Sequence, residues 1–130
     1  MGTAENVELV RRGYEAFNAG NMATLGEIFA EDAVWHAAGN GVLSGTKQGR
    51  DAVLAYFGEL GARSGGSFQA DVRDIVGGEE HTVAIQQNHS ESNGKTLDMG
   101  SVIAFVVRDG QIAEGREYSE DTAKWDDFWA

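Results

Sequence analysis

Glu117 is a candidate for acid/base chemistry. It lies in the segment Gln111–Ser119, which is expected to form a strand, and alternation gives one face of that strand the residues Ala113, Gly115, Glu117 and Ser119. In an apolar cavity the pKa of a carboxyl group rises because desolvation penalises the anion, and a raised pKa suits proton transfer near neutral pH. On a solvent-facing strand the same carboxylate is a surface group paired with a nearby cation. The composition of the strand does not decide which face is buried.

His89 is a second candidate, because imidazole titrates near neutral pH and can exchange a proton with a carboxyl group. It shares an expected strand face with Val83, Ile85 and Gln87, a series that changes from apolar to polar. Such a series is typical of a pocket wall that runs from a dry base to a wet mouth, where Gln87 would orient a substrate carbonyl. The alternatives are a strand-end histidine that faces solvent and a glutamine satisfied within the core.

Several other side chains are expected to form the wall of a pocket for an organic ligand. Trp35 shares a strand face with Ala33 and Ala37, and its flat apolar ring suits either ligand stacking or core packing. His36 then points to the opposite face and contacts a ligand only at the rim. Tyr14 lies on the apolar stripe of an expected helix, where its hydroxyl would donate to an oxyanion or be satisfied in the core. Three residues are expected to line the pocket without chemistry: Phe17, Met99 and Ser101.

Helices are expected to fill the N-terminal half. Apolar residues at three- and four-residue spacing predict a helix from about Asn6 to Asn18, then a short helix capped by Asn21. A short strand is expected at Ala33–Ala37, and the glycine-rich segment Gly39–Gly49 is interpreted as a loop. A third helix follows and carries Val53, Tyr56, Phe57 and Leu60.

Two turn signals, Asn93-Gly94 and Asp109-Gly110, divide the C-terminal half into strands. Both suit type I′ hairpin turns, whose two central residues need positive φ. The expected strands are Phe68–Val76, His81–Glu91, Thr96–Val107 and Gln111–Ser119. Ser119 is expected to cap a last short helix that folds Trp125, Phe128 and Trp129 back onto the sheet. The result is an α+β fold, in which three N-terminal helices pack against a curved antiparallel or mixed sheet to form a cone.

The composition limits the range of functions. The 130 residues are interpreted as one domain, residues 1–130, and the formal charge of −11 disfavours nucleic acid and anionic membranes as partners. No signal peptide or long apolar segment is recognised, so the expected location is the cytoplasm. The three histidines, His36, His81 and His89, are not spaced as metal ligands, and the chain has no cysteine. Neither a metal nor a cofactor is expected.

The chain resembles the SnoaL-like branch of the nuclear-transport-factor-2-like superfamily over nearly its whole length. The segments that carry the resemblance, in this order, are Arg12–Asn21, Phe29–His36, Ser44–Val53, and Arg108–Ile112 together with Arg116–Tyr118. The resemblance implies a cone-shaped domain with an interior cavity for a small, hydrophobic or weakly polar organic ligand. It also implies a homodimer formed through the sheet.

The resemblance separates the known chemistries of the superfamily. The position of the general-base aspartate of ketosteroid isomerases matches Ala37, and the charged pair of limonene epoxide hydrolases matches a stretch that ends at Gln87, so both constellations are incomplete. Polyketide cyclases need only an acid/base group, an apolar cavity and hydrogen bonds to an enolate. The resemblance turns Glu117 inward for that role, with His89 as its partner. A non-catalytic binding protein and a dimeric interaction domain are the alternatives.

Overall fold

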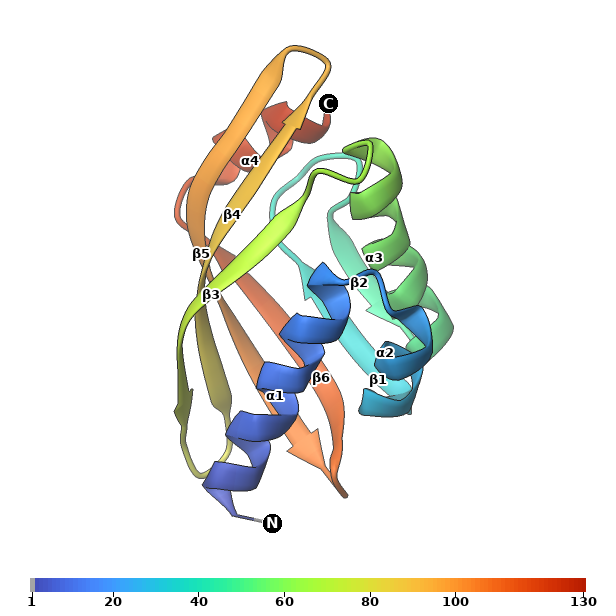
Figure 1. Cartoon of the computed structure of the whole chain (residues 1–130), viewed down its shortest axis with the longest axis vertical. Helices are drawn as coiled ribbons and strands as arrows, with labels where there is room; N and C mark the ends of the chain where they lie inside the picture. The colour runs from blue at the N-terminus through green and yellow to red at the C-terminus, as the bar shows by residue number, and fades with distance from the viewer. Residues whose placement is uncertain (1) are drawn as a thin grey trace.

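The computed structural model describes residues 2–130, which form four helices and one six-stranded sheet (Figure 1). The helices are α1 (Thr3–Asn18), α2 (Met22–Ile28), α3 (Arg50–Arg63) and α4 (Thr122–Trp129). The strands are β1 (Phe29–Ala37), β2 (Gly45–Gln48), β3 (Gln69–Gly77), β4 (Thr82–Ser92), β5 (Lys95–Arg108) and β6 (Gln111–Ser119). The expected α+β class is therefore confirmed.

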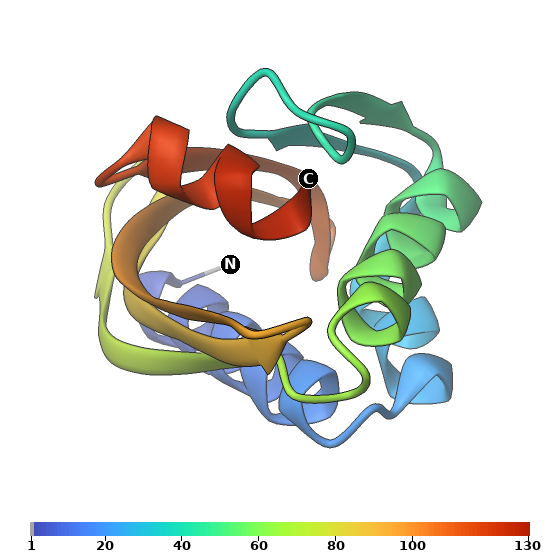
Figure 2. The ribbon, with the colours of Figure 1, turned by 90° about the horizontal axis from the view of Figure 1, so that it is seen from above.

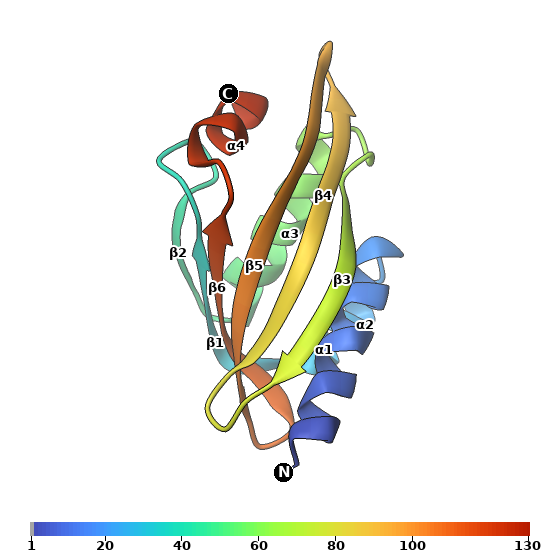
Figure 3. The same cartoon turned by 90° about the vertical axis from the view of Figure 1, so that its left-hand side faces the viewer.

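The sheet has the strand order β2-β1-β6-β5-β4-β3. Its neighbouring strands are antiparallel, except that β1 and β6 are parallel, so the sheet is mixed. The long strands β4 and β5 bend strongly along their length (Figure 3). Seen from above, the curved strands and helices α1, α2 and α3 surround the interior, and α4 lies across one end (Figure 2).

The two hairpin turns have the backbone that their residues predict. Asn93 and Gly94 have φ values of 52° and 77°, and Asp109 and Gly110 have φ values of 54° and 76°. Positive φ at both central positions matches the twist of the flanking strands, which fixes the register of β4, β5 and β6.

Two local expectations were wrong. The segment Gly39–Gly49 is not all loop, because it contains the edge strand β2, which pairs with the end of β1. Exposed polar residues dominate β2, so it gives no apolar alternation by which to recognise it. The cap of α4 is Asp121 rather than Ser119, since the Asp121 side chain accepts a hydrogen bond from the Lys124 amide.

The core lies between helices α1–α3 and the concave face of the sheet. Phe57 of α3 stands at its centre and makes edge contacts with Phe17, Phe29 and Trp35, with ring centroids 5.4, 5.6 and 5.0 Å away. Such edge-to-face contacts fix the rings more tightly than burial alone. Within residues 2–130, no helix combines the length and the apolar character needed to cross a bilayer.

Candidate active site

A cavity lies between the helices and the concave face of the sheet. Most of its lining is apolar, and its rings include Phe17, Phe29, Trp35, Phe57, Phe68 and Phe105. The space open to the centres of water-sized molecules is about 70 Å³, which is enough for several waters. Polar groups reach this space from two walls, one formed around Glu117 and one formed by α1, β4 and β5.

Glu117 lies at the cavity with its carboxylate held by three donors. Trp35 Nε1 and Tyr56 Oη donate to Oε2, at 2.8 and 2.6 Å, and the backbone N–H of Ala38 donates to Oε1 at 2.8 Å. An ionised carboxylate offers about four lone-pair positions. Among the groups that the structure describes, the three donors leave one position, on Oε1, for a bound molecule.

The environment raises the pKa of Glu117 above its ordinary value of 4.5. Burial is the main cause, because it removes the hydration that stabilises the anion. The hydrogen bonds from Tyr56, Ala38 and Trp35 and the positive charge of Lys47 act in the opposite direction without cancelling it. Glu117 is half-buried and borders the cavity. A raised pKa brings the titration of a carboxyl group closer to neutral pH, which suits a group that accepts and returns a proton.

The indole of Trp35 occupies space that is free because residue 115 is glycine. Trp35 and Gly115 are register partners on the parallel strands β1 and β6. A Cβ atom at position 115 would overlap Cζ3 and Cε3 of the indole, so only glycine lets the ring lie against β6. Glu117 is two residues further along the same strand face, within reach of the indole N–H.

A string of uncharged hydrogen bonds forms the second wall. The Tyr14 hydroxyl donates to Gln86 Oε1, and Gln86 Nε2 donates to Asn88 Oδ1 at 2.7 Å. Asn88 Nδ2 then donates to the carbonyl of Met99 at 3.1 Å and to Ser101 Oγ at 3.0 Å. Burial, with a smaller contribution from the Glu117 charge, raises the pKa of Tyr14, so its phenol stays neutral. Tyr14 and Glu117 both line the cavity.

The structure places five of the predicted site residues at the cavity: Glu117, Trp35, Tyr14, Phe17 and Ser101. Met99 is buried on the same side of β5, where its carbonyl accepts from Asn88. The roles of these residues in binding or catalysis remain predictions.

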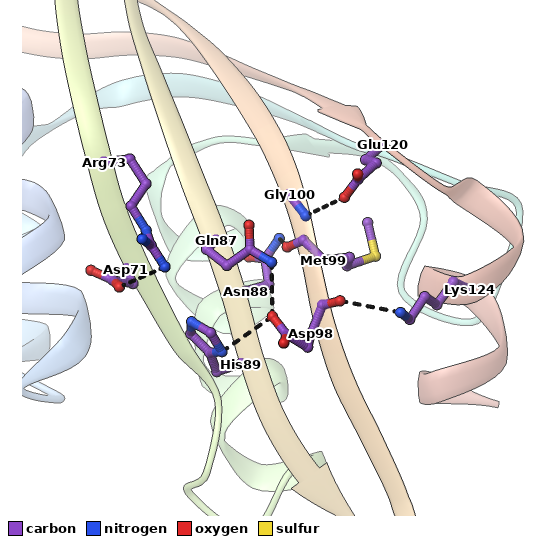
Figure 4. A network of polar contacts seen from close by, with 10 residues as sticks. All are labelled: Asp71, Arg73, Gln87, Asn88, His89, Asp98, Met99, Gly100, Glu120 and Lys124. Atoms are coloured by element: carbon purple, nitrogen blue, oxygen red, sulfur yellow. Dashed lines mark hydrogen bonds and ion pairs between the residues drawn. The ribbon is translucent and has the colours of Figure 1, made fainter.

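The expectation that His89 and Gln87 form the cavity wall was wrong. Both point to the outer face of β4, where Gln87 Nε2 donates to Asp98 Oδ1 at 2.8 Å and His89 Nδ1 lies 3.4 Å from the same oxygen (Figure 4). The alternate residues Gln86 and Asn88 face inward. Because side chains alternate along a strand, an error of one residue exchanges the two faces. His89 therefore cannot partner Glu117.

His36 also lies outside the cavity. Its Nε2 is 2.7 Å from Glu114 Oε2, and its Nδ1 is 3.2 Å from Thr46 Oγ1. Its inclusion among ligand-contacting residues was wrong, because alternation along β1 turns it away once Trp35 faces inward.

Four contributors to the site were not predicted: Tyr56, Gln86, Asn88 and the backbone N–H of Ala38. Tyr56 had a usable signal, since it shares the apolar face of α3 with Val53 and Leu60 and carries a hydroxyl into the core. Gln86 and Asn88 had none, because the polar residues on the two faces of β4 look alike in the sequence.

Comparisons with known proteins agree with this architecture. Residues 10–115 match the SnoaL-like domain family. An uncharacterized protein of Mycobacterium tuberculosis is 30% identical over 126 residues, with 96% of both chains covered. The structure of a protein from a soil-derived mobile gene cassette is 40% identical, covers 98% of both chains and has a TM-score of 0.96. IdmH, a candidate polyketide cyclase from Streptomyces antibioticus, is 28% identical with a TM-score of 0.73, over 91% of this chain and 96% of that chain.

Proposed function

Because the chain belongs to the SnoaL-like family, we propose that it is a cofactor-free enzyme of the cyclase or isomerase type. It binds an uncharged or weakly polar organic molecule in its cavity and uses Glu117 to move a proton on that molecule. The similarity to IdmH supports this class of reaction.

The observation that carries the proposal is a carboxylate with a raised pKa and one open lone pair at an otherwise apolar cavity. A ligand anion beside that carboxylate would be repelled strongly where the dielectric constant is low, so the substrate is uncharged. The aromatic lining favours a molecule that contains a ring.

In the proposed reaction, Glu117 Oε1 removes a proton from a carbon next to a carbonyl group. Oε2 is held by Trp35 and Tyr56, so the carboxylate keeps one orientation throughout. The enolate then attacks a second carbonyl carbon in a cyclisation, or takes the proton back at another carbon in an isomerisation. Glu117 returns the proton in either case, so the step balances without a cofactor.

Deuterium exchange tests this role directly. Phenylacetone is a neutral single-ring ketone, and NMR in heavy water follows the loss of its benzylic protons. We expect the wild-type protein to accelerate the exchange and Glu117→Gln to lose about 10²–10⁴-fold of that acceleration, the usual contribution of a positioned acid/base group. The rate should rise with pH through a pKa above 4.5, because the base is the carboxylate.

The matched control is Glu91→Gln, which removes an exposed carboxylate from β4 and should leave exchange unchanged. Equal exchange in wild type and Glu117→Gln would contradict the proposed role. Binding of phenylacetone without accelerated exchange would instead favour the non-catalytic binding protein.

We also propose that the outer face of the sheet joins two copies of the chain. Ile85, Val102 and Tyr118 form a row across β4, β5 and β6, and Ile85 and Tyr118 are 44% and 56% exposed. Covering this row with a second copy would remove apolar surface from water. Light scattering should report a dimer that Ile85→Asp converts to a monomer, whereas Val76→Asp at the β3 edge should leave it intact. A wild-type monomer would refute this arrangement.

The cytoplasmic location stays a prediction.

A further inference from the structure

The direction of the hydrogen bonds in the second wall is fixed by one backbone group. The carbonyl of Met99 can only accept, so the Asn88 side chain must present its NH₂ group there, and the two are 3.1 Å apart. If the Asn88 amide were turned over, two carbonyl oxygens would face each other in the core. Asn88 is fully buried, so no water would relieve that contact.

The orientation of Asn88 determines that of Gln86. With its NH₂ group toward Met99 and Ser101, Asn88 presents Oδ1 to Gln86. Gln86 must therefore donate from Nε2, which lies 2.7 Å from that oxygen. Gln86 therefore presents Oε1 to Tyr14, and the Tyr14 hydroxyl has to donate to it. The Met99 carbonyl of β5 thus determines the direction of each hydrogen bond through β4 to Tyr14 of α1.

Tyr14 is consequently not free to donate to a ligand. Its single hydroxyl hydrogen is directed at Gln86, which leaves lone pairs on its oxygen as acceptors. Of the two alternatives that the sequence left open for Tyr14, this contact fits the hydroxyl satisfied in the core rather than the oxyanion donor.

Ser101 is at the other end of this series of hydrogen bonds, and unlike Tyr14 it has a hydroxyl hydrogen to donate. Its oxygen accepts from Asn88, and within residues 2–130 its hydroxyl hydrogen meets no acceptor. Ser101 borders the cavity and is the register partner of Gln86. Directly opposed residues on neighbouring strands have Cβ atoms about 5 Å apart. The Ser101 hydroxyl therefore lies beside Gln86, the residue to which Tyr14 is bonded.

We propose that Ser101 donates a hydrogen bond to a carbonyl oxygen of the ligand, while Tyr14 accepts one from a hydroxyl group of the same ligand. The cavity therefore selects uncharged ring compounds that carry both groups. This inference rests on the proposed function only for the presence of a ligand in the cavity, and it requires no turnover.

Three single-ring probes test the assignment. meta-Hydroxyacetophenone carries both groups, meta-methoxyacetophenone has lost the hydroxyl hydrogen, and meta-ethylphenol has lost the carbonyl. Tryptophan fluorescence titration measures their binding, because Trp35 and Trp125 border the cavity. We expect the first probe to bind about tenfold more tightly than either of the others, which corresponds to one buried hydrogen bond.

Variants separate the two ends of the string. Ser101→Ala should weaken both ketones about tenfold and leave meta-ethylphenol unchanged. Tyr14→Phe should weaken the binding of the two phenols and leave that of meta-methoxyacetophenone unchanged.

The assignment is overturned if Ser101→Ala has no effect on the binding of the ketones, or if Tyr14→Phe weakens the binding of meta-methoxyacetophenone. Selective binding without deuterium exchange would refute only the proposed catalysis. A wild-type chain that binds none of the probes would refute both proposals.

A neutron crystal structure provides a second test that needs no ligand. The deuterium on Tyr14 Oη should point to Gln86 Oε1, and the Asn88 ND₂ group should face Met99. A Tyr14 deuterium directed into the cavity would overturn the assignment.

Discussion

The two faces of β4 contrast sharply although their residues alternate along one strand. On the inner face, Gln86 and Asn88 are buried and uncharged, and each is bonded in one fixed orientation. On the outer face, Gln87 and His89 share the exposed carboxylate of Asp98 (Figure 4). Buried polar groups are costly to leave unpaired, whereas exposed ion pairs contribute little. Residues of similar type therefore form a buried, fully bonded wall of the cavity on one side and exposed polar surface around His89 on the other.

The largest expected effect tests this contrast directly. Asn88→Ala should lower the free energy of unfolding by about 3 kcal/mol, because it strands the Met99 carbonyl and the Gln86 amide and leaves a cavity. His89→Ala, one residue away, should cost less than about 0.5 kcal/mol, as expected for a partly exposed pair. Urea unfolding measures both. Similar losses in the two variants would contradict the distinction between the faces.

A smaller effect is expected where a side chain is added to the Glu117 wall. Gly115→Ala should cost about 2 kcal/mol from overpacking and displace the Trp35 indole. Loss of the indole donor should raise the pKa of Glu117 further, since a hydrogen bond to the anion is removed. Carbon-13 NMR of the carboxyl group follows that titration.

Gly61→Ala is the control for this variant. Gly61 is in α3, and an added Cβ would meet open space. Alanine is the better helix former, so the control should be neutral or stabilised by up to about 1 kcal/mol. An unchanged Glu117 titration in Gly115→Ala would show that Trp35 does not depend on the glycine.

The smallest expected effect is a dependence of stability on pH. The pKa of Glu117 is higher in the folded than in the unfolded chain, so the folded state holds its proton more firmly. The protonated Glu117 carboxyl therefore stabilises the fold at pH values below the pKa of this residue in the unfolded chain. This stabilisation is lost as the pH rises through the pKa of Glu117 in the folded chain. Each tenfold difference in acid strength is worth about 1.4 kcal/mol.

Glu117→Gln cannot titrate at this position. The wild type should therefore lose stability relative to the variant as pH rises from 4.5 through the raised pKa of Glu117 in the folded chain. Urea unfolding at several pH values measures the difference. A constant difference across the range would mean that burial does not shift the titration of Glu117.

Most of the fold, apart from the edge strand β2, could be predicted from the sequence because its signals are local. The Asn93-Gly94 and Asp109-Gly110 turns determine the strand order of the C-terminal half, and apolar spacing defines the helices. The inner face of β4 could not be predicted in the same way. Both faces carry apolar residues near their start, Val83 on one and Ala84 on the other, and both end in polar residues. Only contact with α1 decides which set is buried.

The Glu117 wall could be predicted in part. The resemblance identified the carboxylate, and alternation along β1 placed Trp35 inward. The donors Tyr56 and Ala38 depend on how α3 and the end of β1 approach β6, which no local pattern reports.

The parallel pairing of β1 with β6 also determines when this centre can form. The three donors to Glu117 are separated from it by 82, 61 and 79 residues of chain. Contacts between such distant segments close late, because a long loop must be ordered before they contribute. A nascent chain therefore lacks the centre until its last strand has been synthesised and docked. The intensity of the Trp35 emission would then report completed assembly rather than early collapse.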